Sequence, residues 1–387
     1  LEFRRVLFRS VVIMGAETTT TVREERRPPE SDVREVAPGV LRIQLPMNMP
    51  GLGHVNTYVI EDRDGVALID PGTPSLRSWQ VLRKKLDEVG LPLRRVHTVV
   101  VTHSHPDHYG AAQRIREVSG AELVTHENFK TYWDPHEESD LIHEVAVVSD
   151  FEVQFNAIER SLLKVTGRQR HSPWDRPVPW GGPPPDNEWR ARFRWRVLPL
   201  LLSKVWQPPK PSRRVVDGQI LVLGDREWVS VHTPGHTADH LCLLDPVEGI
   251  FVSGDHLLPT ITPHISGLTT QRRPMADFLL SLERMYTYDD VKVVLPAHGL
   301  EFHDLAGRSK AIVEHHQGRF ATLTNAAALT PGNELSVPEF SKHLFKPHSW
   351  GPMADSETFA HLEYLRQTGK AVTRVDQGEL RYRIVEH

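Results

Sequence analysis

Four short apolar runs in this sequence end in turns that carry histidine or aspartate. In chain order the segments are VHTVVVTHSHPDH, VSVHTPGHTADH, GIFVSGDH and VKVVLPAHG. Each is typical of a buried strand that ends in a tight turn of small residues. The polar side chains at these strand ends are His103, His105, Asp107, His108, His236, Asp255 and His298.

The first of these segments has the strongest chemical signal. A single histidine at the end of a strand is usually an ordinary polar residue, and one H-x-H spacing is also weak evidence. The H-x-H-x-D-H pattern that starts at His103 is different, because one loop offers two imidazoles, a carboxylate and a third imidazole. Neutral imidazole is the commonest metal ligand in proteins, and such a set can divide between two cations about 3.5–4 Å apart.

The segments around these turns predict a layered α/β domain. Strand patterns occur at GVLRIQLP, NTYVIEDRDGVALIDPG and AELVTH, and hairpins are expected at QILVLGDREWVSVHT and DHLCLLDPVEGIFVSGD. Between them, SLRSWQVLRKKLDEVG has the apolar spacing of a helix, with Ser75 as its N-cap and Gly90 as its stop. Alternating strands and helices favour helices packed on sheets.

The order of these motifs resembles the metallo-β-lactamase-fold hydrolase superfamily, including its hydroxyacylglutathione hydrolase-like branch. That family has H-x-H-x-D-H, then a histidine in a TPGHT-type turn, an aspartate, and a histidine in P-x-H-G; the match here covers roughly residues 33–300. The resemblance implies an αββα four-layer sandwich. It also implies two Zn²⁺ ions per chain, with iron or manganese as alternatives.

The same resemblance assigns roles to individual residues. One metal would be held by His103, His105 and His236, and the second by Asp107, His108 and His298, with Asp255 as the bridge. Asp70 in ALIDPG matches a family position that supports the site from behind the ligands. We expect His240 to act in the same supporting layer or to face the substrate.

The chain divides into three expected parts. Residues 1–32 have the composition of a disordered lead-in, of which residues 1–12 look like an artefact upstream of Met14. Residues 33–303 form the expected catalytic domain, with a helical insertion at about 127–214. Residues 304–387 form a C-terminal module.

The insertion is rich in tryptophan, proline and arginine. We assign substrate binding to four of its arginines, which are Arg190, Arg192, Arg194 and Arg196. Arginines suit an anionic group, and tryptophans can cover apolar substrate area, so the insertion could be a lid or a substrate wall. The alternative is a helical pair that merely caps the sheet.

The C-terminal module has three helical patterns followed by a hairpin whose turn lies at residues 376–378, which suggests a winged-helix-like module. Such modules often bind DNA, but SETFAHLEYLRQTG carries two glutamates against one arginine, so we do not favour nucleic acid. A packing role or a homodimer contact fits this composition better.

Composition limits the partners and the compartment. The chain has 387 residues, a formal net charge of -4 and one cysteine, Cys242. These values give no general attraction to nucleic acid or anionic membranes, and no apolar run is long enough for a membrane span. A lone cysteine fits a reducing compartment, so we expect a cytoplasmic protein that acts on a small-molecule substrate.

The expected chemistry is hydrolysis by a metal-bound hydroxide at the carbonyl of a thioester, ester or lactone. In this scheme Asp107 is the catalytic residue that orients the hydroxide and shuttles a proton. A metal-dependent endoribonuclease or phosphodiesterase is the main alternative. An iron enzyme similar to persulfide dioxygenases is a third hypothesis, although it uses fewer of these ligands.

Overall fold

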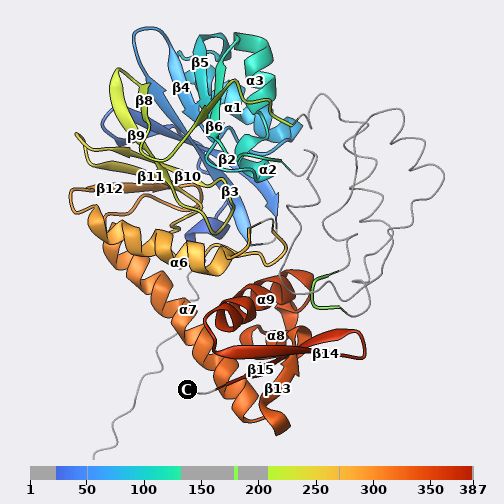
Figure 1. The fold of residues 1–387 in the computed structure, drawn as a ribbon. Helices are drawn as coiled ribbons and strands as arrows, with labels where there is room; N and C mark the ends of the chain where they lie inside the picture. Colours follow the sequence, from blue (N-terminus) through green and yellow to red (C-terminus); the bar gives the residue numbers. More distant parts are fainter. Residues whose placement is uncertain (1–22, 50, 132–177, 182–207, 270, 386–387) are drawn as a thin grey trace, which may run out of the picture.

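The computed structural model describes residues 23–49, 51–131, 178–181, 208–269 and 271–385. Two β-sheets pack face to face in the upper part of the molecule as drawn in Figure 1. The first sheet has seven strands in chain order: β1 (Arg34–Ala37), β2 (Val40–Met49), β3 (Leu52–Glu61), β4 (Val66–Ile69), β5 (Val96–Val100), β6 (Glu122–His126) and β7 (Arg213–Val215). Strands β1 to β4 pair antiparallel, and β4 to β7 pair parallel.

The second sheet has five strands in the order β12-β11-β10-β9-β8. Its strands are β8 (Ile220–Leu223), β9 (Arg226–His232), β10 (Leu241–Asp245), β11 (Ile250–Gly254) and β12 (Val293–Pro296). Only the β11–β12 pair of this sheet is parallel. The carboxyl ends of β11 and β12 therefore meet at one edge, where the following turns carry Asp255 and His298.

Helices cover the outer faces of both sheets. On the first sheet lie α1 (Leu76–Glu88), α2 (Pro106–Tyr109) and α3 (Ala112–Ser119); on the second lie α6 (Pro274–Arg284) and the upper part of α7 (Leu305–Ala328) (Figure 1). Helix α1 begins as expected, because the Ser75 side chain accepts a hydrogen bond from the Ser78 backbone. Short 3₁₀ helices complete the domain: η1 (Glu24–Arg26), η2 (Leu93–Arg95) and η5 (Met285–Thr287).

Apolar side chains fill each space between these layers. Trp79 and Leu82 of α1 are buried against the first sheet, and Phe278 of α6 is buried against the second. Between the sheets, Ile60 and Trp228 belong to one buried cluster, to which both sheets contribute. The expected αββα sandwich is confirmed.

The C-terminal part has its own core, and α7 joins it to the sandwich (Figure 1). It comprises the end of α7, η6 (Pro331–Asn333), β13 (Glu334–Ser336), α8 (Val337–Leu344), η7 (Pro347–Ser349), α9 (Pro352–Gln367), β14 (Ala371–Asp376) and β15 (Glu379–Ile384). The hairpin β14–β15 was expected, but β13, which pairs with β15 to form a three-stranded sheet, was not. Three helices and a terminal hairpin are present; the comparison with a winged helix stays a prediction.

The lead-in differs from the expectation. We predicted disorder for residues 1–32, but residues 23–32 are folded against the sandwich, whereas residues 1–22 lie outside the described part of the chain. Glu25 is fully buried and accepts hydrogen bonds from the backbone of Thr260 and Ile261. A polar sequence is ordered here because a distant loop supplies donors for its carboxylate.

Most of the insertion also lies outside the described residues. Its fragment at residues 178–181 contacts the C-terminal module rather than the sheets. Trp180 is buried 5.2 Å from the ring of Phe359, and its carbonyl accepts a hydrogen bond from Leu380. This tryptophan is therefore a packing residue.

Candidate metal centre

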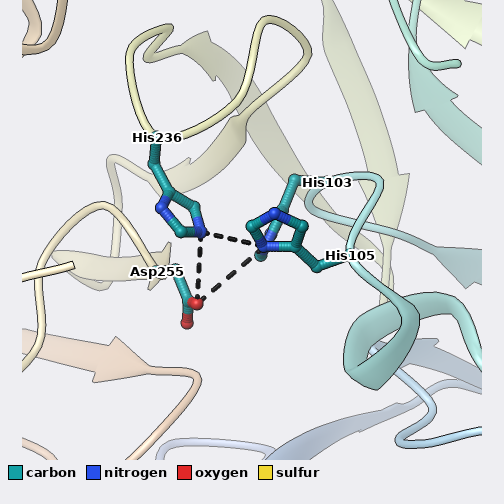
Figure 2. Close-up of side chains that lie close together, drawn as sticks. All are labelled: His103, His105, His236 and Asp255. Carbon is teal, nitrogen blue, oxygen red and sulfur yellow. Dashed lines mark hydrogen bonds and ion pairs between the residues drawn. The ribbon is translucent and has the colours of Figure 1, made fainter. Parts of the chain in front are cut away.

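The first group of candidate ligands comes from three separate turns. His103 and His105 follow β5, His236 follows β9, and Asp255 follows β11. Figure 2 shows the four side chains pointing toward one another. His105 Nδ1 lies 3.0 Å from His103 Nε2 and 3.0 Å from His236 Nε2, and Asp255 Oδ2 lies 3.5 Å from His236 Nε2.

The second group lies beside the first. Asp107 and His108 occupy the short helix α2, and His298 follows β12. Asp107 Oδ2 lies 3.4 Å from His108 Nε2 and 3.5 Å from His298 Nε2. All three residues are buried, so the folded chain holds these polar atoms away from bulk water.

Asp255 connects the two groups. Its Oδ2 faces His236 of the first group and lies 3.6 Å from His108 Nε2 of the second, while its Oδ1 lies 3.4 Å from His298 Nε2. The structure therefore brings together all seven residues that the sequence singled out. A carboxylate placed between two donor groups is suited to bridge two cations.

The atoms that face the centre lack other partners. His108 Nε2, His298 Nε2 and Asp255 Oδ1 are buried and make no hydrogen bond to any part of the chain that the structure describes. Leaving a buried polar atom unpaired costs roughly 1–3 kcal/mol, and more for a charged one. Divalent cations would satisfy all three atoms, and imidazole with carboxylate is a suitable donor set. The residues present thus fit metal ions.

The other ring nitrogens are fixed by the protein. His236 Nδ1 donates to the carbonyl of His264 over 2.8 Å, and His298 Nδ1 donates to the carbonyl of His54 over 2.7 Å. His108 Nδ1 donates to Asp70 Oδ2 over 2.8 Å. Each bond leaves the Nε2 lone pair directed at the centre, which is the arrangement that metal-binding histidines require.

The sequence matches the model of the Metallo-beta-lactamase superfamily over residues 50–298, which is more than half of the chain. This chain belongs to that superfamily. Membership implies a divalent metal, in agreement with the two donor groups. In the wider chain, no described helix has the length and apolar content needed to cross a membrane.

Solved structures extend the likeness beyond the matched region. A metallo-beta-lactamase family protein from Thermus thermophilus is 26% identical, with a TM-score of 0.65, and the alignment covers 90% of this chain and 99% of that one. A Beta-lactamase domain protein from Burkholderia ambifaria is 24% identical, with a TM-score of 0.68 and coverage of 93% and 96%. Both alignments cover a larger share of this chain than the family model does, and the likeness they show is one of fold.

Curated relatives include a probable metallo-hydrolase and thioesterases. Probable metallo-hydrolase YqjP of Bacillus subtilis is 22% identical over 355 residues, 89% of this chain and 97% of its own length. Atrochrysone carboxyl ACP thioesterase dmxR1 of Cryptosporiopsis sp. is 30% identical over 115 residues, 29% of this chain and 33% of its own. Acyl-coenzyme A thioesterase MBLAC2 of Gallus gallus is 31% identical over 121 residues, 30% and 38%. This chain thus matches only about a third of each thioesterase.

Asp70 supports both donor groups of this superfamily site. Its carboxylate accepts from His108 Nδ1 and from the backbone and hydroxyl of Thr102, at 2.8 and 2.7 Å. The Thr102 hydroxyl also lies 3.0 Å from His103 Nδ1, so Asp70 reaches one ligand of each group. Asp70 itself has a φ of 55°, a left-handed conformation that is uncommon outside glycine.

His240 does not point to the donor atoms but holds the turn behind them. Its Nε2 accepts from the backbone N–H of Asp255 over 3.1 Å, and its Nδ1 contacts the Thr233 hydroxyl at 2.8 Å. Gly254 makes this approach possible, because a Cβ there would lie 2.8 Å from His240 Nε2 and its φ is +52°. Of the two roles we considered for His240, the geometry favours support.

Burial and charge set the protonation of the centre. Burial, with the neighbouring His236, lowers the pKa of His105 to about 3, so its ring is neutral and able to bind a cation. Burial opposes the ionisation of Asp255, but His298 and His108 hold the pKa of this carboxyl well below its usual range. At neutral pH the centre therefore offers a neutral His105 beside an ionised Asp255. Burial opposes the protonation of His108 and His298, but the Asp107 and Asp255 carboxylates raise the pKa of both rings.

Sequence reasoning missed several supporting groups. The carbonyls of His54 and His264 were not foreseen, because a backbone acceptor has no residue-type signature. Asp239, in the same turn as His236, accepts a hydrogen bond from the Ser104 hydroxyl over 3.0 Å and so joins two ligand-bearing loops. The available sequence signal for this residue was an aspartate close to the candidate ligand, in HTADH. The four arginines of the insertion lie outside the described residues.

Proposed function

We propose that this chain is a dinuclear metal-dependent hydrolase that attacks the carbonyl carbon of a thioester, ester or lactone with water and cleaves its acyl C–S or C–O bond. The observation that carries the proposal is the convergence of seven donors in two groups around buried atoms that lack other partners. In this proposal His103, His105 and His236 hold one cation, and Asp107, His108 and His298 hold the other. Zinc is the default ion for this donor set, with iron or manganese as alternatives.

Two cations, when bound, would supply Lewis acidity toward the carbonyl oxygen and lower the pKa of an attacking water. The chain's own contribution is orientation and proton transfer. Asp255 lies between the two donor groups and contacts a histidine of each. Asp107, whose Oδ2 faces His108 and His298, is placed to orient the attacking water and accept its proton.

The relatives favour acyl substrates over the alternatives. Two relatives of about 30% identity bear thioesterase names, although each match covers only part of the relative. The names concern acyl groups on an acyl carrier protein and on coenzyme A. We therefore place a small acyl thioester first among the candidate substrates, ahead of simple esters and lactones.

A substrate panel tests the proposal. Zinc-reconstituted protein is assayed on an acyl-coenzyme A, a lactone, p-nitrophenyl acetate and bis-p-nitrophenyl phosphate, with Asp255→Ala as the matched inactive control. We expect cleavage of the thioester that is lost in the variant. Cleavage of the phosphodiester alone would replace this proposal with the phosphodiesterase alternative.

A further inference from the structure

The loop between β11 and α6 contains a contact that the proposed chemistry does not use. Its residue His264 supplies the carbonyl that accepts from His236 Nδ1. The side chain of the same residue reaches the C-terminal module, where its Nδ1 lies 3.1 Å from Glu357 Oε2 on α9. One residue thus links a candidate ligand to a helix that is about a hundred positions later in the chain.

Helix α9 makes further hydrogen bonds and packing contacts with this loop. Gly267 donates its backbone N–H to the carbonyl and to the hydroxyl of Ser356, both over 3.1 Å. The Ser266 hydroxyl lies 3.0 Å from the same Ser356 hydroxyl. Gly267 has no room for a side chain, because a Cβ would lie 2.6 Å from the Phe359 ring. The loop and the helix are therefore packed at backbone distance.

Glu357 is the charged centre of this contact. It is 7% exposed and forms an ion pair with Arg319 of α7 through its other oxygen. A buried carboxylate with two fixed partners resists movement, because losing Arg319 would leave a buried charge uncompensated and losing His264 would leave one carboxylate oxygen without this partner. Its position therefore determines where His264, and with it the carbonyl that orients His236, can lie.

We infer that Glu357 is a positioning residue through which the C-terminal module sets the orientation of His236 and thereby the affinity of the first metal position. This inference rests on the proposed role of His236 as a metal ligand. The module would then be part of the active-site support rather than an appended binding domain. Groups behind metal ligands typically change metal affinity about 10–100-fold when they are removed.

A matched pair of variants on α9 tests the inference. Glu357→Gln keeps the shape of the side chain but removes its charge. Glu363→Gln is the control, since Glu363 is a similarly buried acid of the same helix whose partners are Arg366 and Tyr382, away from the loop. Ser356→Ala provides a second, milder variant that removes the hydroxyl contacts with the loop.

Zinc affinity is measured by competition with a chromophoric chelator, with thermal melting in parallel. We expect Glu357→Gln to weaken one of two zinc-binding steps about 10–100-fold, Ser356→Ala to weaken the same step less, and Glu363→Gln to leave both steps unchanged. Unchanged affinities in Glu357→Gln, or equal weakening in Glu363→Gln, would overturn the inference while leaving the proposed function intact. A wild-type protein that binds no zinc would instead refute the proposed function and the inference together.

Discussion

Asp70 accepts a hydrogen bond from Nδ1 of His108 over 2.8 Å, although the Asp70 backbone has an unfavourable φ of 55°. Non-glycine residues in this region persist where surrounding contacts hold them, and they often occur at functional sites. Here Thr102 supplies two of those contacts, from its backbone and its hydroxyl. The strained position allows one carboxylate to orient a histidine of each donor group.

Asp70→Asn should therefore weaken metal binding at both positions. The amide can no longer accept from every donor around it, so we expect the zinc affinity of the protein to fall about 10–100-fold. Chelator competition measures the change. Asp62→Asn is the control, because Asp62 also contacts a histidine, His97, and accepts from two backbone N–H groups, but on the β3–β4 turn. Equal losses in both variants would contradict the role of Asp70.

Asp255→Ala and His103→Ala should each abolish hydrolysis while the fold survives. Both residues lie in turns at one edge of the sandwich, whereas the cores on either side of each sheet are formed by other, apolar side chains. We expect bound zinc to fall below two ions per chain and the melting temperature to fall moderately. Elemental analysis and circular dichroism check these outcomes. An unfolded variant would show that the site and the cores are not separable.

Stability should depend on pH through the buried histidines outside the centre. His361 is fully buried, and this burial, with the nearby Arg319 charge, lowers its pKa to about 4. The unfolded chain takes up a proton near pH 6.5, whereas the folded chain does not, so stability falls as the pH drops from about 6.5 to 4. One such histidine lowers the free energy of unfolding by on the order of 3 kcal/mol over this pH range.

His361→Gln removes this titrating group. Urea denaturation at several pH values measures the free energy of unfolding of the wild type and of the variant. Through that window, the stability of the variant relative to the wild type should rise steadily as the pH falls. Because both proteins keep the same candidate metal ligands, acid loss of metal cancels in the comparison. A constant difference from pH 7 to pH 4 would show that His361 does not contribute.

Replacing the four insertion arginines with alanine, singly and together, should raise KM for anionic acyl substrates and leave kcat and zinc content unchanged. This prediction rests on the sequence, since Arg190, Arg192, Arg194 and Arg196 lie outside the described residues. Arg63→Ala is the control, because Arg63 is exposed and pairs with Asp225 on the sandwich surface. Wild-type kinetics in every variant would show that these arginines do not bind an anionic group of the substrate, which would contradict this part of the lid hypothesis.

The layered α/β class and the candidate donors could be predicted because they depend on local pattern, whereas the αββα arrangement was implied by the resemblance of these motifs to a known family. Apolar runs that end at His103, His236, Asp255 and His298 define strands and strand-end turns with no knowledge of distant contacts. The spacing within H-x-H-x-D-H places donors on both sides of one loop. The structure confirms the αββα sandwich and brings all of these side chains together.

The remaining features depend on contacts between segments far apart in the chain. Glu25 is ordered by donors at Thr260 and Ile261, although its local sequence is typical of disorder. Glu357 contacts His264, 93 positions away, whose carbonyl accepts a hydrogen bond from His236. Neither relationship has a local signature, because each depends on which surfaces meet after the layers have packed.

The central claim is that two bound cations, held by two groups of side chains, enable hydrolysis of an acyl thioester. Titration of zinc into metal-free protein, with acyl-coenzyme A hydrolysis measured at each step, tests it most directly. The account predicts negligible activity without metal and a rise that levels off near two equivalents. Activity that levels off at one equivalent or below, or full zinc loading with no cleavage of any carbonyl substrate, would contradict it.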